Sequence, residues 1–319
     1  MDGQPGHRRG PRRRRPGVAL GRSSLDRPGR ATALLLRRSP DVGPEGVENG
    51  PVGEFWYAAA TTVGRAAMRA LDVRLEVDGL EHVPTSGPVI LAATHVSYLD
   101  ALPLALAARR RGRTPRFMAR HDVWHAPGIA GPMTRMRHIP VDRAAPAAAY
   151  LQARRLLRDG EMVGTFPEAG ISYSFTVRPL MRGTAALARE TGAVVVPAAL
   201  WGIQRIYSVG RPEGGELGGR EPGPDLTRGR RVDLRFGPPL TVGPGEDLDS
   251  WTTKLGVRLT EMLEDLQTAE HHRPRPGEYA PWYPAHLGGH APTRAEAARW
   301  DNSPRSALPA SWATVPEPS

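Results

Sequence analysis

The feature that most constrains the fold is a regular alternation of short apolar runs with amphipathic stretches between residues 73 and 266. The runs have the length of buried strands, and the stretches between them place apolar residues at helical spacing. Such alternation predicts an α/β fold with a mostly parallel central sheet flanked by helices. In folds of this kind, ligands bind at the carboxyl ends of the strands.

The pattern predicts each element by its residue range. The predicted strands are residues 73–77, 88–93, 116–119, 138–141, 162–166, 193–200 and 232–236. The predicted helices are residues 101–110, 147–158, 182–190 and 250–266, preceded by an amphipathic helix over residues 55–71. The helix over 182–190 should stop at Gly192, because glycine readily takes the left-handed conformation that ends a helix. A Gly/Pro-rich loop is expected over residues 210–229.

The two ends of the chain differ in composition from this middle. Residues 1–50 hold eleven arginines against five acidic residues, and residues 271–319 are rich in proline with isolated aromatic residues. Both ends lack apolar periodicity, so both are predicted to be disordered tails. The chain should therefore hold a single domain over residues 51–270, with the helix over 55–71 leading into a core over 72–266.

Charge and cysteine content limit the classes of function. The formal net charge is +10, and a basic N-terminal tail could bind either nucleic acid or an anionic membrane, so a non-catalytic binding protein is one alternative. Basic residues are not interleaved with aromatic ones, as nucleic-acid readers require. The chain has no cysteine, which excludes disulfides, cysteine metal sites and thiol catalysis and favours a cytoplasmic location.

Apolar segments near the N-terminus bear on membrane association. Residues 33–36 form too short a run for a secretory signal, and the stretch over 55–71 is interrupted by Arg65 and Arg69. That stretch is also shorter than the roughly 20 residues that a helix needs to cross a bilayer. We therefore expect a protein associated peripherally with the inner face of the cell membrane. The helix over 55–71 could lie in the membrane interface or pack on the core.

A histidine and an aspartate follow the predicted strand over 88–93. His95 and Asp100 are five residues apart, which on a continuous helix would turn their side chains about 140° away from each other. His95 should therefore lie in the loop, where its ring can point back at Asp100 in the first turn of the next helix. A carboxylate on one ring nitrogen leaves the other nitrogen basic, which suits a general base for hydroxyl deprotonation.

Two further motifs end predicted strands. Arg143 follows the strand over 138–141 and could hold a phosphate group in a bidentate fork. Residues 165–172 follow the strand over 162–166 and read Thr-Phe-Pro-Glu-Ala-Gly-Ile-Ser. They predict a tight turn whose amides could approach an oxyanion, with Glu168 ordering the turn through hydrogen bonds. Taken alone, Arg143 could form an ordinary surface ion pair, and residues 165–172 could form an ordinary turn.

With these motifs in order, residues 71–266 resemble the glycerolipid acyltransferase family, which includes lysophosphatidic acid and glycerol-3-phosphate acyltransferases. That family has a histidine and an aspartate separated by four residues, an arginine closing an apolar strand, the sequence Phe-Pro-Glu-Gly-Thr-Arg-Ser and a Val-Pro strand. The corresponding residues here are His95 and Asp100, Arg143, residues 166–172 and Pro197.

The resemblance implies direct transfer of a fatty acyl group from acyl-CoA or acyl carrier protein to a lysophospholipid hydroxyl. The product expected from 1-acylglycerol-3-phosphate is phosphatidic acid. His95 would be the base and Asp100 its orienter, with no metal and no cofactor. Substrate-binding roles are implied for Arg143, Phe166, Pro167, Glu168, Ala169, Gly170 and Pro197. The expected partners are the acyl thioester, the lysophospholipid and a membrane surface.

The sequence departs from the family pattern at one place. Ala169, Gly170 and Ile171 stand where the family has Gly-Thr-Arg, so an arginine that binds phosphate is missing. Arg178 or Arg182 could replace it by reaching back from the following residues; otherwise the acceptor would be a different lipid or a glycolipid. A hydrolase acting on acyl esters is a further alternative, but the chain has no Gly-x-Ser-x-Gly motif to supply its nucleophile.

Overall fold

The computed structural model describes residues 51–210 and 222–312, which lie in one compact unit of the chain. Their strands form a single sheet in the order β1-β7-β6-β2-β5-β3-β4, and every neighbouring pair is parallel except β6 with β7. The strands are β1 (Arg74–Asp78), β2 (Val89–Ala93), β3 (Pro115–Arg120), β4 (Ile139–Val141), β5 (Met162–Thr165), β6 (Val194–Trp201) and β7 (Arg231–Phe236). The predicted α/β fold with a mostly parallel sheet is confirmed.

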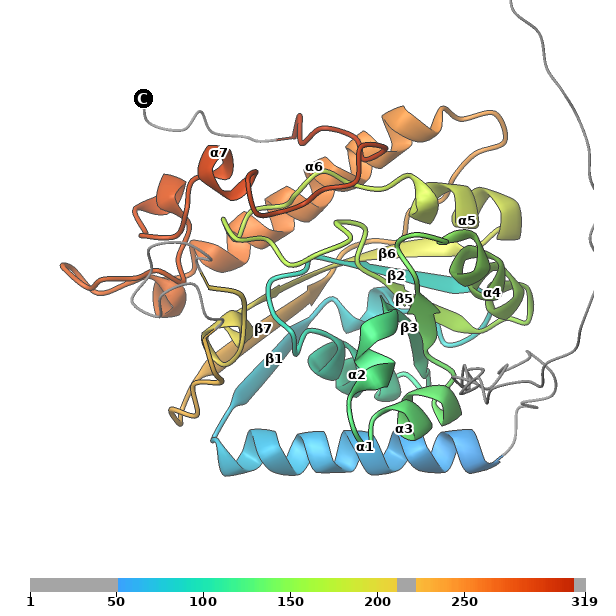
Figure 1. Ribbon diagram of the computed structural model, residues 1–319, viewed down its shortest axis with the longest axis horizontal. Coiled ribbons are helices and arrows are strands. Elements are labelled where there is room, and N and C mark those ends of the chain that lie inside the picture. Colours follow the sequence, from blue (N-terminus) through green and yellow to red (C-terminus); the bar gives the residue numbers. More distant parts are fainter. Residues whose placement is uncertain (1–50, 211–221, 313–319) are drawn as a thin grey trace, which may run out of the picture. The chain divides into compact units, whose positions relative to one another are not determined.

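Helices cover both faces of this sheet (Figure 1). One face carries α1 (Pro51–Ala70), α2 (Ala101–Arg109) and α3 (Ala130–Arg135), and the other carries α4 (Ala147–Arg158), α5 (Gly183–Thr191) and α6 (Leu248–Gln267). Short helical turns are η1 (Leu80–His82), η2 (His121–His125), η3 (Ile203–Arg205), η4 (Glu270–His272) and η5 (Ala285–Leu287), and a last short helix is α7 (Arg294–Ala297). As predicted, α5 ends at Gly192, whose φ is 68°.

The core lies in two layers because the central strands are covered on both faces. All five residues of β2 are buried, and they alternate between the layers: Ile90 and Ala92 face α4, α5 and α6, whereas Leu91 faces α1 and α2. Strands buried on both sides appear in the sequence as continuous apolar runs. This is why the strand positions could be recognised from the sequence.

The amphipathic N-terminal helix was predicted over 55–71 and forms as α1. Its buried face packs on α2 and α3, and the hydroxyl of Tyr57 donates to the carbonyl oxygen of Pro115 at 2.9 Å. Phe55 and Val63 lie on its exposed face. Among the described residues, no helix combines the length and the apolar character that crossing a membrane requires.

The prediction of a disordered C-terminal tail is wrong for residues 271–312. Tyr283 and Trp312 are almost fully buried in the same core cluster as α6. The ring of Trp312 lies where a side chain at Gly256 would otherwise stand, and Leu308 pairs with Leu180 through backbone hydrogen bonds. A few widely spaced aromatic side chains thus fix a Pro-rich segment that has no apolar periodicity. The predicted tail over 1–50, residues 313–319 and residues 211–221 of the predicted loop lie outside the described residues.

Candidate active site

The candidate site lies where β2 and β5 end. These strands are parallel neighbours, so their carboxyl ends meet at one edge of the sheet. His95 follows β2 after one residue, and Glu168 follows β5 in the turn over 166–170. The backbone N–H of Ser172 donates to the carbonyl oxygen of His95 at 3.1 Å, which joins the two loops directly.

His95 and Asp100 form a hydrogen-bonded pair. The Nδ1 atom of His95 lies 2.8 Å from Oδ2 of Asp100, which is the first residue before α2 and is fully buried. The same oxygen accepts the backbone N–H groups of Val96 at 2.8 Å and Ser97 at 2.9 Å. The loop between the two residues therefore holds the carboxylate that orients the imidazole.

This arrangement determines which ring nitrogen can act as a base. A proton on Nδ1 is donated to Asp100, so Nε2 of His95 is left to accept a proton from a substrate. Burial raises the pKa of Asp100, while the hydrogen bonds from His95 and from the loop amides oppose the increase. The His95 side chain is 20% exposed, which leaves room for a substrate to approach the ring.

Two phenylalanines support the imidazole ring. Phe166 stacks on His95 with the ring centroids 4.2 Å apart and the planes 20° from parallel. Phe117 of β3 stacks in turn on Phe166 at 6.2 Å. Since Phe166 follows β5, the neighbouring strands β3 and β5 fix the plane of the histidine that follows β2.

Glu168 ties together the loops around the site. Its Oε1 accepts the backbone N–H of His95 at 2.7 Å, and its Oε2 accepts the backbone N–H of Arg178 at 2.8 Å. The side chain is almost completely buried, and burial raises its pKa to about 8, against the effect of the two amide hydrogen bonds. Its geometry is that of a residue that orders the turn, as the sequence suggested.

The turn that contains Glu168 has an unusual backbone. Ala169 has a φ of 56°, a left-handed conformation that glycine adopts far more easily than alanine. At Gly170 a side chain would place its Cβ 2.3 Å from Nη1 of Arg178. Gly170 therefore allows the Arg178 guanidinium group to lie directly against the turn.

Arg143 reaches the same turn from β4. Its Nη2 donates to the carbonyl oxygen of Ala169 at 2.7 Å. The pKa of Arg143 lies below its usual value, first because of partial burial and then because the positive charges of Arg120 and Arg178 are close. Arg120, the last residue of β3, thus adds a second exposed guanidinium group near Arg143, where it pairs with Asp122. The arrangement could attract a phosphate group.

The two arginines that could replace the missing family arginine have different positions. Arg178 lies at the turn, but it is buried, and it donates to the carbonyl oxygens of Ile171 and Asp301 and to the hydroxyl of Ser303. Arg182 pairs instead with Asp249 of α6. The structure therefore brings Arg178 to the site with Nη1 and Nη2 bound by other residues and Nε 3.5 Å from Oδ2 of Asp301, and it directs Arg182 toward α6.

Pro197 lies away from the loops of the site, and so do the side chains that could bind a metal ion. Pro197 is buried within β6 and is aligned with Ala92 of β2, inside the sheet rather than in the loops beyond it. In the part of the chain that the structure describes, the cluster of side chains close enough to share a metal ion contains Asp233 and two histidines on β7 and η4. It does not include His95.

Comparisons with known proteins show which family this part of the chain resembles. A family model described as Acyltransferase matches residues 74–201. Over residues 74–201 the chain is therefore similar to acyltransferase-family domains. The chain is 28% identical over 141 residues to a chloroplastic 1-acyl-sn-glycerol-3-phosphate acyltransferase of Brassica napus, a match that covers 43% of this chain and 40% of the relative. It is also 28% identical over 138 residues to the human 1-acyl-sn-glycerol-3-phosphate acyltransferase alpha, covering 42% and 48% of the two chains.

A solved structure has a similar fold. The crystal structure of the 1-acyl-sn-glycerophosphate acyltransferase PlsC from Thermotoga maritima superposes with a TM-score of 0.53 at 20% identity, over 68% of this chain and 81% of that one. The chain spans less than half the length of the curated relatives named above. The family model matches the part of the chain that holds His95 and Glu168.

Three residues around the acyltransferase-family site were not recognised from the sequence. Phe117 supports Phe166, Arg120 lies beside Arg143, and Asp301 pairs with Arg178 at 3.5 Å. Phe117 and Arg120 are at positions in β3 that the predicted sheet could have placed near this edge. No local pattern indicates Asp301, because its partner lies 123 residues earlier in the chain.

Proposed function

We propose that this protein transfers a fatty acyl group from a thioester donor to the free hydroxyl of 1-acylglycerol-3-phosphate, which gives phosphatidic acid. The hydrogen bond between His95 and Asp100 is the observation that carries the proposal. Nε2 of His95 removes the proton of the acceptor hydroxyl, and the resulting oxygen nucleophile attacks the thioester carbonyl. The carbon–sulfur bond then breaks, the departing thiolate takes the proton from Nε2 of His95, and acyl-CoA or acyl carrier protein leaves as the free thiol, without a covalent enzyme intermediate.

The acceptor part of the proposal rests on charge at the turn. Arg143 and Arg120 lie close to each other, and arginine binds phosphate through two parallel hydrogen bonds. The turn that Arg143 contacts begins with Phe166, which stacks on His95. A phosphate held by these arginines would place the glycerol hydroxyl of the acceptor toward the histidine. The names of the relatives support the same acceptor.

The membrane part of the proposal rests on α1. Phe55 and Val63 are 65% and 70% exposed on this helix, and large apolar side chains exposed on one face of an amphipathic helix can enter a lipid interface. We propose that the protein acts at the inner surface of the cell membrane, where lysophospholipid is available to the site.

A second candidate is acyl transfer to a lipid or glycolipid acceptor that has no phosphate at this position. It is favoured by Arg178, whose guanidinium group is buried and bound by Asp301 and Ser303. Ile171 stands where the family arginine would be and is 7% exposed. In this candidate, His95 and Asp100 keep their roles and only the acceptor differs.

The test is a panel of acceptors incubated with purified protein and one acyl-CoA, with the products identified by mass spectrometry. The panel contains 1-acylglycerol-3-phosphate, glycerol-3-phosphate, other lysophospholipids and a glycolipid. His95→Ala should abolish product formation, whereas His290→Ala, which removes an exposed histidine far along the chain, should not. Product from the glycolipid alone would favour the second candidate. A wild-type rate with His95→Ala would refute the assigned base.

A further inference from the structure

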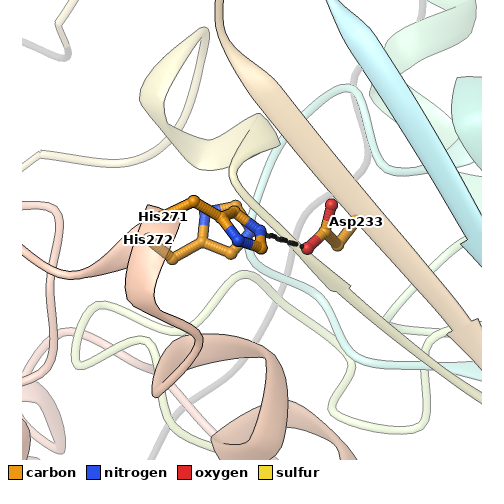
Figure 2. Close-up of side chains that lie close together, drawn as sticks. All are labelled: Asp233, His271 and His272. Atoms are coloured by element: carbon orange, nitrogen blue, oxygen red, sulfur yellow. Dashed lines mark hydrogen bonds and ion pairs between the residues drawn. The ribbon is translucent and has the colours of Figure 1, made fainter.

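Two adjacent histidines and an aspartate that take no part in the candidate active site, His271, His272 and Asp233, lie close together (Figure 2). The Nε2 atom of His271 lies 2.6 Å from Oδ2 of Asp233, and that of His272 lies 3.1 Å from the same oxygen. One ligand atom from each of the three residues lies within 4.8 Å of the other two. Both imidazole rings thus present a nitrogen to a single carboxylate.

The fold brings these residues together from separate elements. Asp233 lies in the middle of β7, aligned with Trp201 of β6 and Glu76 of β1. His271 and His272 belong to η4, which follows the end of α6. The His272 ring fits against Gly202, where a side chain would place its Cβ 3.0 Å from Cε1 of the ring. The absence of a side chain at Gly202 therefore allows the ring to reach the sheet.

The carboxylate of Asp233 is bound unequally. Its Oδ2 is close to both imidazole rings, whereas its Oδ1 is buried and has no hydrogen-bond partner among the described residues. A buried acceptor without a donor is unfavourable by about 1–3 kcal/mol. A cation bound by the carboxylate and by both imidazoles would remove this imbalance.

The charges around Asp233 also leave its carboxylate available to a cation. Arg231 and Arg235 flank Asp233 on β7, and each pairs with an acidic residue of β1, Glu76 or Asp78. The positive charges nearest in sequence are thus paired with other carboxylates.

We propose that Asp233, His271 and His272 form a binding site for a divalent transition-metal ion, with zinc as the ion that fits best. Zinc binds imidazole nitrogen and carboxylate oxygen at about 2.0–2.2 Å, and sites with three protein ligands complete their coordination with water. Tetrahedral ligands at that distance lie about 3.3 Å apart, so the three side chains need only open slightly. The His271 side chain is 32% exposed, which gives the water a place. This site departs from the expectation of a protein without metal.

The bound ion would fasten the start of the C-terminal segment, residues 271–312, to β7. The same segment later supplies Asp301 and Ser303 to Arg178 beside the candidate active site. The ion would therefore stabilise the folded segment without touching substrate. The metal site does not depend on the proposed acyl transfer, and it can be tested by binding alone.

The test uses the full chain without a polyhistidine tag, stripped of metal by EDTA. Zinc chloride is added while heat is measured by titration calorimetry, and the metal content after dialysis is measured by mass spectrometry. We expect one zinc ion per chain. His271→Ala and Asp233→Asn should each weaken zinc binding by more than about 100-fold, because even the loss of a residue that only orients a ligand costs 10- to 100-fold.

A matched variant makes the result specific. His121 and His125 form another close pair of histidines, with ring centroids 5.0 Å apart, and His125→Ala removes one of them. This variant should bind zinc as the unmodified chain does, and zinc should raise the melting temperature of both but not that of His271→Ala. Equal zinc affinity in His271→Ala and the unmodified chain would overturn the proposal, as would loss of binding in His125→Ala alone. The absence of any zinc binding would overturn it too.

Because His271 is partly exposed, its replacement should leave the chain folded, and far-ultraviolet circular dichroism checks this. If Asp233→Asn does not fold, His271→Gln provides the second variant. Cobalt(II) gives an independent readout, since an ion held by these side chains should produce visible absorption bands that disappear in either variant of His271. Bands that persist in those variants would contradict the assignment.

Discussion

The two sides of the candidate active site are built in different ways. The His95 side is local: Asp100 is held by the histidine and by the amides of Val96 and Ser97, all within six consecutive residues. The Glu168 side depends on distant segments. Glu168 accepts the backbone N–H of Arg178, and the guanidinium group of Arg178 donates to the carbonyl oxygen of Asp301, near the end of the chain.

In the proposed reaction, the His95 side transfers the proton and the Glu168 side binds the acceptor. The His95 side needs only the end of a strand and the start of a helix, so substitutions elsewhere in the chain should leave its geometry unchanged. The Glu168 side combines the ends of β4 and β5 with the C-terminal segment, so changes far away in sequence can alter it. We expect substitutions on the first side to affect turnover, and substitutions on the second to affect acceptor binding and stability.

The largest effect is expected for Asp100→Asn. The oxygen of the new amide can still accept hydrogen bonds from the loop amides and from His95, as Oδ2 does now, while its NH₂ group replaces Oδ1, which is buried and has no partner among the described residues. The mutation therefore removes the negative charge that stabilises the imidazolium formed when Nε2 takes a proton, and His95 becomes a weaker base. We expect kcat to fall by about 10²- to 10⁴-fold, the usual contribution of a general base.

Steady-state kinetics with acyl-CoA and the best acceptor measure this change. Asp159→Asn, at an exposed position after α4, is the matched control and should retain the unmodified kcat. If Asp100→Asn changed only KM, the carboxylate would not set the state of the imidazole, and the local side of the site would lose its assigned role.

The next effect concerns the remote support of the turn. Asp301→Asn removes the negative charge 3.5 Å from the buried guanidinium group of Arg178. Removing one partner of a buried ion pair leaves the other charge uncompensated, and we expect the free energy of unfolding to fall by about 3 kcal/mol. Urea unfolding followed by circular dichroism provides the measurement.

An exposed ion pair offers the comparison. Asp225 pairs with Arg230 and is about half exposed, so Asp225→Asn should lower the free energy of unfolding by less than about 1 kcal/mol. Equal losses for Asp225→Asn and Asp301→Asn would show that the C-terminal segment does not support the turn.

Arg143 tests the acceptor directly. Arg143→Ala should raise KM for 1-acylglycerol-3-phosphate by about 10- to 100-fold and change kcat little, because a hydrogen bond to a charged group contributes about 1.5–3 kcal/mol. Arg143→Lys keeps the positive charge but loses the two parallel N–H donors of the guanidinium group. Its KM should lie between those of the unmodified chain and Arg143→Ala. The same KM increase with an acceptor that has no phosphate would mean that Arg143 acts only by holding the carbonyl oxygen of Ala169.

The sequence predicted the elements of the fold more closely than the surroundings of the site. Strands buried on both faces appear as apolar runs, so β2 and β6 were recognisable as runs made mostly of Val, Ile, Leu and Ala. The closeness of His95 to Asp100 was also predictable, because a strand ends and a helix begins only a few residues apart there.

What the sequence did not reveal depends on contacts between distant residues. Trp312 lies over Gly256, and Asp301 meets Arg178. Each contact involves one residue in a segment with no periodicity, so no window of sequence contains the signal. Arg182 is an error of the opposite kind. Its position in the sequence suggested that it reaches the site, but its guanidinium group pairs with Asp249 of α6. Side chains choose partners by distance in the folded chain.

Glu168 makes the support of the turn dependent on pH. Its ordinary pKa is 4.5, and burial raises it to about 8 in the folded chain. Between these values the folded state holds a proton that the unfolded state has lost, so this contribution to stability is complete below about pH 4.5 and is lost as the pH rises toward 8. The slope is at most about 1.4 kcal/mol per pH unit.

Urea unfolding of the unmodified chain and of Glu168→Gln across this range isolates the effect. Other titrating groups are the same in both proteins, so the difference in slope belongs to Glu168. The unmodified chain should lose stability more steeply with rising pH than Glu168→Gln. Parallel curves would show that Glu168 is ionised throughout, as its two amide donors favour.

The smallest effect is expected at the backbone of the same turn. Ala169 has a φ of 56°, and a left-handed conformation costs a non-glycine residue about 1–2 kcal/mol. Ala169→Gly removes this strain but adds conformational freedom to the unfolded chain, so the net gain should be about 1 kcal/mol or less. The melting temperature should rise by about 2–4 °C or less, measured by differential scanning calorimetry.

Ala67→Gly, on the exposed side of α1, is the control and should lower the melting temperature, because glycine weakens a helix by about 1 kcal/mol. A fall for both variants would mean that the methyl group of Ala169 contributes more to the packing of the turn than its conformation costs.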